Sequence, residues 1–549
     1  MLDLSRLHEA VRSEGGVSRR LFLAFGSALA AVPLLGVRAS AADRKVTFDA
    51  DPFSLGVASG DPAADSVVLW TKLAPKPLEA DGGMKPEVVN VGWEIAEDDA
   101  FKKVVASGTA VATPQLGHTV HIEAAGLKPD RWYHYRFRAG DATSPVGRTR
   151  TMPAADATPD KLKLTFASCQ HYEQGFYTAY EQMAKDTPDL VFHLGDYIYE
   201  YPYREPNPNL RQGGATQAVV RRHTGPKDGK LKTLADYRGR HALYRADKFL
   251  HQMHALCPWF VTWDDHEVDN NYANDIQEEQ RGGKEKTPPA EFLIQRAAAY
   301  QAYYEFMPLR KRSLPTGPDM LLYRKASFGR LAEFFVLDTR QYRTDQPNGD
   351  GMKELNEAAL DPKNTQLGKE QRKWLDAGLI ASEGQWNILA QQVMMGMVHR
   401  TVDQKEVFSM DQWPGYAHER NAVMKFLHDR KVPNPVVLTG DIHSNWVNDL
   451  RTNDLDEKAP VVAAEFVGTS ISTGGNGKEV PKAEMDKLTA SNPGVRFYNR
   501  ERGYVRCTIT PTTWTSDYVV VDDVRKEEGK CQVRASFVVE AGTPGAKKV

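Results

Sequence analysis

The stretch Leu190-Val191-Phe192-His193-Leu194-Gly195-Asp196 decides the fold class of this sequence. Its first five residues are largely apolar and have the length of a buried strand, and the Gly-Asp pair after them is typical of a turn. A second apolar strand is expected at 162–167, with a helix at 176–185 between the two. Because a strand, a helix and a strand in succession form a parallel unit, the sequence predicts an α/β domain.

This strand and three others end in residues that can bind a metal ion. The other three are Leu164-Thr165-Phe166-Ala167-Ser168-Cys169, Phe260-Val261-Thr262-Trp263-Asp264-Asp265-His266-Glu267 and Val436-Val437-Leu438-Thr439-Gly440-Asp441-Ile442-His443. In an open α/β sheet, ligands bind beyond the carboxyl ends of the strands, so we expect the four turns to converge in one crevice. Asp196 alone would suit a helix N-cap equally well. Several carboxylates buried together are unfavourable unless cations neutralise them, so the set predicts a metal centre.

β-Rich regions flank this α/β pattern on both sides. Short strands separated by turn residues fill 53–153, and Tyr133 after Leu127-Lys128-Pro129 resembles the tyrosine corner of fibronectin-type sandwiches. We therefore expect an all-β sandwich domain at 42–153. The catalytic domain is expected at 154–549, and its C-terminal tail is again β-rich.

The four cysteines have different expected roles. Cys507 and Cys531 lie on two tail strands and could pair in an oxidising compartment, although their separation in sequence does not establish the bond. Cys257 lies in an apolar run and is expected to be a buried free thiol. Cys169 is the cysteine available to the predicted metal centre.

The first 41 residues have the features of an export signal. Arg19-Arg20 precede Leu21-Phe22, an apolar stretch of about a dozen residues follows, and Ala39-Ser40-Ala41 fits a cleavage site. The apolar stretch is shorter than the roughly 20 residues that span a bilayer. The arginine pair resembles a twin-arginine signal, so we expect residues 1–41 to be removed after export by the Tat translocon. The final compartment is expected to be the periplasm, the cell wall or the extracellular medium.

Composition excludes several other classes of protein. The chain has 549 residues, 70 Lys and Arg against 72 Asp and Glu, and only 4 Cys. The near balance of charge gives no support for a nucleic-acid partner, and four cysteines are too few for a disulfide scaffold. Polar segments rich in Gly, Pro and charge at 204–230 and 273–289 are expected to be surface loops at the rim of the site.

Some polar residues are not assigned to the site. Five histidines are expected on the surface or in the core: His223, His241, His251, His254 and His418. His171 and His193 remain undecided. Arg340 and Arg343 could bind phosphate, but an arginine after a strand forms a structural salt bridge at least as often.

The motifs resemble those of the purple acid phosphatase-like metallophosphoesterases. Gly195-Asp196-Tyr197-Ile198-Tyr199 fits their Gly-Asp-x-x-Tyr element, Asp264-Asp265-His266-Glu267 takes the place of Gly-Asn-His-Glu, and Gly440-Asp441-Ile442-His443 that of Gly-His-x-His. Together with Ser168-Cys169-Gln170, the run 338–343 and the β domain in front, they are similar to the PhoD-type alkaline phosphatases and phosphodiesterases. The resemblance implies a four-layer metallophosphoesterase-type α/β sandwich preceded by a small fibronectin- or immunoglobulin-like domain.

The same resemblance implies a set of metal ligands. Carboxylates in place of imidazoles favour hard cations, whereas a thiolate, a phenolate and an imidazole suit Fe³⁺. Fe³⁺ is expected on Cys169, Asp196, Tyr199 and His443, and Ca²⁺ on Asp196, Asp265 and Asp441, with Asn270, Asn271 and Gln391 as weaker oxygen donors. Asp265 and His266 are the expected catalytic residues, with His266 as general acid or as a group behind the ligands.

The expected reaction is hydrolysis of phosphate monoesters and diesters by a metal-activated hydroxide, without a covalent phosphoenzyme. Two alternatives remain open. One is a phospholipase D-type phosphodiesterase acting on phospholipid head groups. The other is a non-catalytic surface protein that binds a partner and is stabilised by structural metals.

Overall fold

The computed structural model describes residues 46–549 except 206–210, 213–214, 217–218, 227–228 and 279–286. The predicted signal peptide therefore lies outside the described residues, and so do parts of both predicted loops. The described chain is a mixed α/β structure with several sheets, as the strand-helix-strand pattern predicts.

A long mixed sheet forms the centre of the molecule. Its strands are, in spatial order, β27 (Thr543–Lys548), β26 (Cys531–Glu540), β25 (Thr513–Val521), β24 (Arg502–Ile509), β9 (Leu162–Ala167), β10 (Leu190–Leu194), β13 (Trp259–Thr262), β1 (Val57–Gly60), β2 (Ser66–Lys72) and β5 (Thr119–Ala125). β9, β10 and β13 run parallel to one another, so their carboxyl ends lie at the same edge. These are three of the four strands that the sequence associates with the site.

A second sheet contributes the fourth of these strands. Its order is β14 (Arg324–Phe328), β15 (Ala332–Val336), β17 (Trp386–Ala390), β20 (Pro435–Thr439), β22 (Val461–Val467), β21 (Asn445–Arg451) and β23 (Val495–Asn499). β15, β17, β20 and β22 are parallel. The predicted crevice is therefore shared between two sheets.

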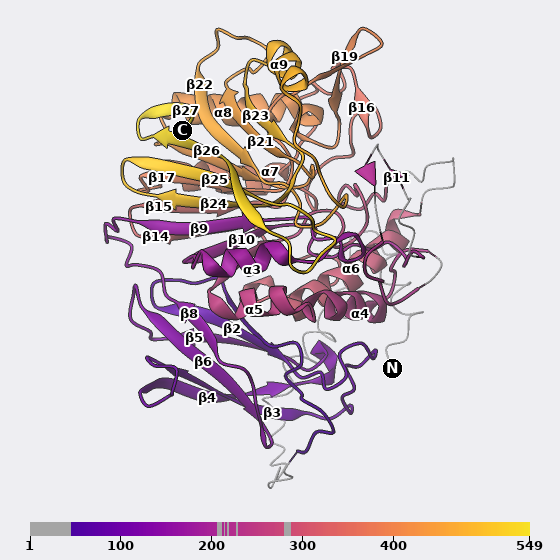
Figure 1. The fold of residues 1–549 in the computed structure, drawn as a ribbon, viewed down its shortest axis with the longest axis vertical. Helices are drawn as coiled ribbons and strands as arrows, with labels where there is room; N and C mark the ends of the chain where they lie inside the picture. The colour runs from indigo at the N-terminus through magenta and orange to yellow at the C-terminus, as the bar shows by residue number, and fades with distance from the viewer. Residues whose placement is uncertain (1–45, 206–210, 213–214, 217–218, 227–228, 279–286) are drawn as a thin grey trace.

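The two sheets pack face to face, and helices cover their outer faces (Figure 1). The helices against the first sheet are α3 (Thr178–Lys185), α4 (Leu234–Arg245), α5 (Lys248–Leu256) and α6 (Pro289–Phe306), and those against the second are α7 (Gly368–Ile380) and α8 (Ala417–Asp429). Successive strand residues alternate between the layers: Phe192 contacts the sheet–sheet core, whereas Val191 faces the helices. Burying one phenylalanine side chain contributes about 1.5–3 kcal/mol, so this core holds the two halves of the crevice in fixed relation.

Two small sheets lie outside the two large ones. A small sheet of β16 (Met352–Lys353), β19 (Lys405–Ser409) and β18 (Arg400–Val402) projects beyond the second sheet, near helix α9 (Lys482–Ser491). A short hairpin pairs β11 (Arg211–Gln212) with β12 (Ala215–Thr216).

The N-terminal β-rich segment is joined directly to the central sheet. Its own sheet consists of β4 (Val104–Ala112), β3 (Val89–Ala96), β6 (Trp132–Ala139), β7 (Ala142–Thr143) and β8 (Gly147–Arg150). Its other strands, β1, β2 and β5, extend the central sheet, where Gly60 pairs with Trp259 of β13. The backbone N–H of Lys128 donates to the Tyr133 hydroxyl at 3.0 Å, as expected for a tyrosine corner. The domain division after residue 153 stays a prediction.

The C-terminal tail also belongs to the central sheet, because β24 pairs with β9. Cys507 on β24 lies opposite Ser516, and Cys531 on β26 lies opposite Val521. The two cysteines are thus on strands that β25 separates. These strands lie roughly 10 Å apart, which already exceeds the reach of a disulfide. All four cysteines are free, so the pairing that the sequence left open does not form, while Cys257 is the buried thiol that was expected.

Across the described ranges, no helix combines the length and the apolar character needed to cross a membrane.

Candidate metal centre

The four predicted strand endings do converge. Side-chain ligand atoms of Cys169, Asp196 and His443 lie within 4.8 Å of one another, and so do those of Asp196, Asp264, Asp265 and Asp441. A third group within the same limit joins Asp196 and Asp265 to His266. Asp196 belongs to all three groups and is therefore the residue around which the centre is built.

Four of these residues lie in left-handed backbone turns. The φ angles of Cys169, Asp196, Asp441 and His443 are 59°, 55°, 63° and 51°. Non-glycine residues seldom adopt this conformation, and it concentrates at functional sites. Gly195 is required before Asp196, because a Cβ at this position would lie 2.4 Å from the Cβ of Asp264.

Tyr199 completes the side of the centre that contains the thiol. Its hydroxyl donates to Oδ2 of Asp196 at 2.7 Å and lies 3.2 Å from Nε2 of His443. The Thr473 hydroxyl is 2.9 Å from the same phenol oxygen. A thiol, a phenol, an imidazole and a carboxylate therefore surround one point, as the Gly-Asp-x-x-Tyr motif implies.

The donor set fits bound cations. Burial raises the pKa of the Cys169 thiol well above its usual range, and the carboxylates of Asp196 and Asp441 raise it further. Burial and the Asp196 carboxylate likewise raise the pKa of the Tyr199 phenol. Oδ1 of Asp196 and Oδ1 of Asp265 are buried without a hydrogen-bond partner. The thiol and the phenol become anionic only beside a strong positive charge, and the unpartnered carboxylate oxygens can accept a cation, so the residues present suit a metal centre.

His266 is held by a buried carboxylate that sequence analysis missed. Its Nδ1 lies 2.7 Å from Oε2 of Glu200, and Oε1 of Glu200 accepts from Lys230 Nζ at 2.9 Å. Although burial alone would lower it, the pKa of His266 is raised well above its usual range by the Asp265, Glu200 and Asp196 carboxylates. A ring nitrogen of His266 also lies within 4.8 Å of carboxylate oxygens of Asp196 and Asp265.

Glu267 fixes the backbone of two of the turns. Its carboxylate accepts the backbone N–H groups of Asp196 at 3.2 Å, Tyr197 at 2.5 Å and Asp264 at 2.8 Å. Burial raises the pKa of Glu267 to about 8 despite these bonds. The last residue of the Asp-Asp-His-Glu run is thus a brace between the ends of β10 and β13.

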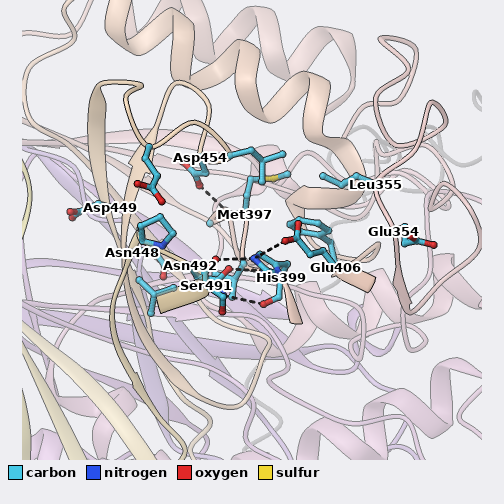
Figure 2. A pocket seen from close by; sticks show the side chains of 18 of the residues that line it. Glu354, Leu355, Met397, His399, Glu406, Asn448, Asp449, Asp454, Ser491 and Asn492 are labelled. Carbon is cyan, nitrogen blue, oxygen red and sulfur yellow. Dashed lines mark hydrogen bonds and ion pairs between the residues drawn. The ribbon is translucent and has the colours of Figure 1, made fainter. Parts of the chain in front are cut away.

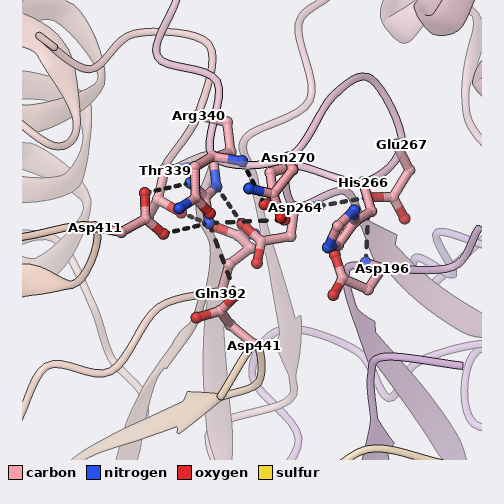
Figure 3. Close-up of polar contacts among 12 residues, drawn as sticks. Asp196, Asp264, His266, Glu267, Asn270, Thr339, Arg340, Gln392, Asp411 and Asp441 are labelled. Atoms are coloured by element: carbon pink, nitrogen blue, oxygen red, sulfur yellow. Dashed lines mark hydrogen bonds and ion pairs between the residues drawn. The ribbon is translucent and has the colours of Figure 1, made fainter. Parts of the chain in front are cut away.

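Asp264 and Asp441 bring the carboxylate-rich side of the centre against Arg340 (Figure 3). Arg340 is fully buried and forms ion pairs with Asp264 and Asp411. Arg343 also pairs with Asp411, at 2.6 Å. Both arginines are buried and form salt bridges, which is the structural role that the sequence left open beside phosphate binding.

The weaker oxygen donors are placed differently. The amide of Gln391 is fully engaged with Val393, Thr439 and Trp413, so the structure does not bring it into the centre. The Asn270 side chain accepts from the Tyr201 hydroxyl at 2.9 Å. The backbone N–H of Asn271 donates to Oδ2 of Asp265 at 2.7 Å, while its side chain donates to Asp350.

The histidines outside the cluster behave as expected. His223, His241 and His254 are buried, His251 is partly buried and His418 is exposed. The ring of His171 lies 4.5 Å from the ring of Tyr199, and His193 is buried within β10. Neither of the two undecided residues belongs to a ligand cluster.

Two other supporting residues had no signal in the sequence. Arg502 on β24 donates to the carbonyl of His443, and Gln412 donates to the carboxylate of Asp441. Both come from segments without a recognisable motif, and only the fold brings them to the ligands.

A separate cavity of about 600 Å³ lies between the β18–β19 hairpin and α9 (Figure 2). His399 at its wall donates its backbone N–H to the Asn492 side chain at 2.9 Å, and its Nε2 lies 2.8 Å from the Ser491 carbonyl. The residues that line this cavity include none of the predicted ligands.

Family models cover both parts of the chain. A model described as PhoD-like phosphatase matches residues 164–518, and one described as PhoD-like phosphatase, N-terminal domain, matches residues 38–153. The chain belongs to the PhoD-like phosphatase family. It is therefore a phosphoric ester hydrolase, and the family that the motifs suggest is confirmed.

Two members of the PhoD-like phosphatase family are closely similar to this chain. Alkaline phosphatase D of Bacillus subtilis (strain 168) is 49% identical over 502 residues, which are 91% of this chain and 83% of the relative. A solved structure of PhoD is also 49% identical and superposes with a TM-score of 0.86, covering 92% of this chain and 93% of that one.

Proposed function

We propose that this PhoD-like phosphatase is an exported alkaline phosphatase and phosphodiesterase that hydrolyses phosphate monoesters and diesters. The observation that carries the proposal is the convergence of a thiol, a phenol, an imidazole and several carboxylates at the ends of strands from both sheets. The finer fold assignment belongs to the same proposal: a four-layer metallophosphoesterase-type sandwich, 154–549, behind a fibronectin- or immunoglobulin-like domain, 42–153.

The ligands divide into two sets. Cys169, Asp196, Tyr199 and His443 would hold Fe³⁺, and Asp196, Asp265 and Asp441 would hold Ca²⁺. When bound, the cations would lower the pKa of water in the site and offset the negative charge of the phosphoryl oxygens.

The protein supplies the proton for the leaving group. The Glu200 carboxylate holds Nδ1 of His266 at 2.7 Å and favours the protonated ring. His266 donates this proton to the ester oxygen as it leaves, and water restores it afterwards. The sequence offers no serine in a nucleophile-elbow context, so hydrolysis proceeds without a covalent phosphoenzyme.

Export belongs to the proposal as well. The Arg19-Arg20 pair and the Ala39-Ser40-Ala41 site support removal of residues 1–41 after passage through the Tat translocon. Replacement of both arginines by lysine is expected to leave uncleaved chain in the cytoplasm. Normal export of that variant would contradict this part.

The decisive experiment combines metal analysis with two assays. Protein purified after export should contain iron and calcium and hydrolyse both p-nitrophenyl phosphate and bis-p-nitrophenyl phosphate. Asp196→Asn should lose both metals and both activities, because Asp196 belongs to every ligand group. Protein that holds only zinc and cleaves neither ester would overturn the proposal, and choline release from lecithin vesicles would redirect it toward phospholipids.

A further inference from the structure

The guanidinium of Arg340 is buried among carboxylates (Figure 3). Nε donates to Oδ1 of Asp264, and Nη1 and Nη2 donate to the two oxygens of Asp411 at 2.9 and 3.0 Å. These contacts use the fork of Arg340 in the bidentate geometry that favours arginine over lysine. Because the side chain has no exposed surface, Arg340 does not touch substrate.

The same guanidinium faces two of the proposed calcium ligands without bonding to them. Nη2 lies 3.8 Å from Oδ1 of Asp265 and 3.8 Å from Oδ1 of Asp441. Both distances exceed a hydrogen bond but permit strong electrostatic attraction in a buried site. Oδ1 of Asp265 has no hydrogen-bond partner at all, so it remains available to a cation.

We propose that Arg340 is a built-in counter-ion of the carboxylate side of the centre. It supplies part of the positive charge when no divalent cation is bound, and it limits how tightly one binds. The inference rests on the proposed assignment of Asp265 and Asp441 as calcium ligands.

The charge count supports this role. Asp196, Asp264, Asp265 and Asp441 gather within one cluster, and repulsion among them opposes folding of the metal-free chain. A fixed cation reduces that repulsion permanently. The same charge repels an incoming Ca²⁺. Arg340 therefore lowers the affinity of the site for calcium while it stabilises the folded, metal-free chain.

Asp411 fixes the position of the Arg340 guanidinium relative to Asp265 and Asp441. It accepts both Nη atoms of Arg340, and it also receives Arg343 at 2.6 Å and Gln346 at 2.8 Å. These bonds hold the guanidinium back from Asp265 and Asp441. Loss of the Asp411 charge would release Arg340 toward the ligands, where it would compete with the metal.

The two residues therefore give opposite expectations. In full-length, iron-containing protein stripped with EGTA, Arg340→Met should lower the dissociation constant for Ca²⁺ about tenfold, because one repelling charge is removed. Asp411→Asn should raise it about tenfold. Calorimetric titration with CaCl₂ measures both, and thermal unfolding with and without CaCl₂ should show a larger calcium-dependent increase in Tm for Arg340→Met than for wild type.

Arg324→Met is the matched control. Arg324 is another buried arginine, paired with Asp61 at 2.6 Å and outside the ligand clusters. This variant should lose stability equally with and without calcium, as a purely structural ion pair would.

The result for Arg340→Met supports or contradicts the counter-ion role. Unchanged or weaker Ca²⁺ binding by Arg340→Met would overturn the inference, whereas folding of this variant only in the presence of CaCl₂ would support it. If it folds in neither condition, the direction of the change in Asp411→Asn decides. The proposed function fails separately, if Asp265→Asn leaves Ca²⁺ binding of the otherwise native chain unchanged.

Discussion

The hydroxyl of Tyr199 lies 2.7 Å from Oδ2 of Asp196, three residues earlier in the same turn. The left-handed conformation of Asp196, with φ of 55°, sends the chain around so that the carboxylate and the phenol meet. The same phenol is 3.2 Å from His443, which comes from the other sheet. Tyr199 therefore links ligands that follow strands of the two different sheets.

Tyr199→Phe should remove iron while leaving the fold intact. The variant retains the ring, which lies 4.1 Å from the ring of His266, but loses the donor oxygen. Iron content by mass spectrometry and hydrolysis of p-nitrophenyl phosphate should both fall by about tenfold or more, whereas stability should change by only about 1 kcal/mol. Tyr201→Phe is the control, because the Tyr201 hydroxyl bonds only to Asn270 in the described structure; an equal loss of iron in both variants would contradict the assignment.

Cys169→Ala should abolish iron binding, because the thiol is one of the three ligands in its cluster. Cys257→Ala is a matched control, since Cys257 is also buried and free but lies outside the clusters. We expect the first variant to hydrolyse neither ester and the second to retain wild-type iron content. Full activity of Cys169→Ala would remove the thiol from the proposed centre.

His266→Gln should distinguish substrates by their leaving groups. Loss of a general acid typically slows reaction by about 10²–10⁴-fold when the leaving oxygen needs a proton. The variant should therefore lose much more activity toward an alkyl phosphate than toward p-nitrophenyl phosphate. Glu200→Gln should show the same pattern more weakly, because it disturbs only the ring's 2.7 Å anchor. An equal loss for both ester types would assign His266 to metal binding or to structure.

Asp441 offers a test of backbone strain. Its φ is 63°, which glycine adopts freely and alanine does not. Asp441→Ala and Asp441→Gly both remove the carboxylate, so they should lose calcium equally. The glycine variant should nevertheless be more stable by about 1 kcal/mol in urea unfolding. Equal stability would show that the turn is not strained.

Stability should decrease below pH 6.5 because neutral histidines are buried. Burial lowers the pKa of His241 from 6.5 to about 3, with a smaller effect from Arg245, and neither ring nitrogen has a hydrogen-bond partner. Between pH 6.5 and 3, His241 is therefore protonated in the unfolded chain but neutral in the folded chain. One such histidine costs about 1.4 kcal/mol per pH unit across this window.

His241→Phe should reduce that pH dependence, because the new ring can still stack on Phe306, which lies 5.2 Å from the present ring. Urea midpoints between pH 7 and 4 measure the effect. His418→Phe is the control, since His418 is exposed. A slope unchanged in His241→Phe would contradict the assignment.

The four strand endings could be predicted because each combines a buried apolar run with polar residues at a fixed offset. The supporting residues could not. Glu200, Asp411 and Arg502 act through contacts with residues 66, 71 and 59 positions away, and no local pattern marks such partners. The motif resemblance predicts the ligands, whereas the residues that hold those ligands in place are seen only in the tertiary structure.

The sequence also does not predict that strands near both ends of the chain join the central sheet. β1 joins β13 through a single residue pair, Gly60 with Trp259, and the tail joins β9 through β24. Alternating strands predict a sheet but not which distant strand will be its neighbour. The same limit explains why the sequence left the cysteine pairing open, because Cys507 and Cys531 both lie on tail strands but with β25 between them.

The carbonyl of His443 is held by Arg502, a residue of the C-terminal tail. A nascent chain therefore has no complete centre until the ribosome has released β24 and the tail has docked beside β9. We expect a chain truncated before residue 502 to bind metal less tightly than the full chain, because the backbone of His443 would lose this contact.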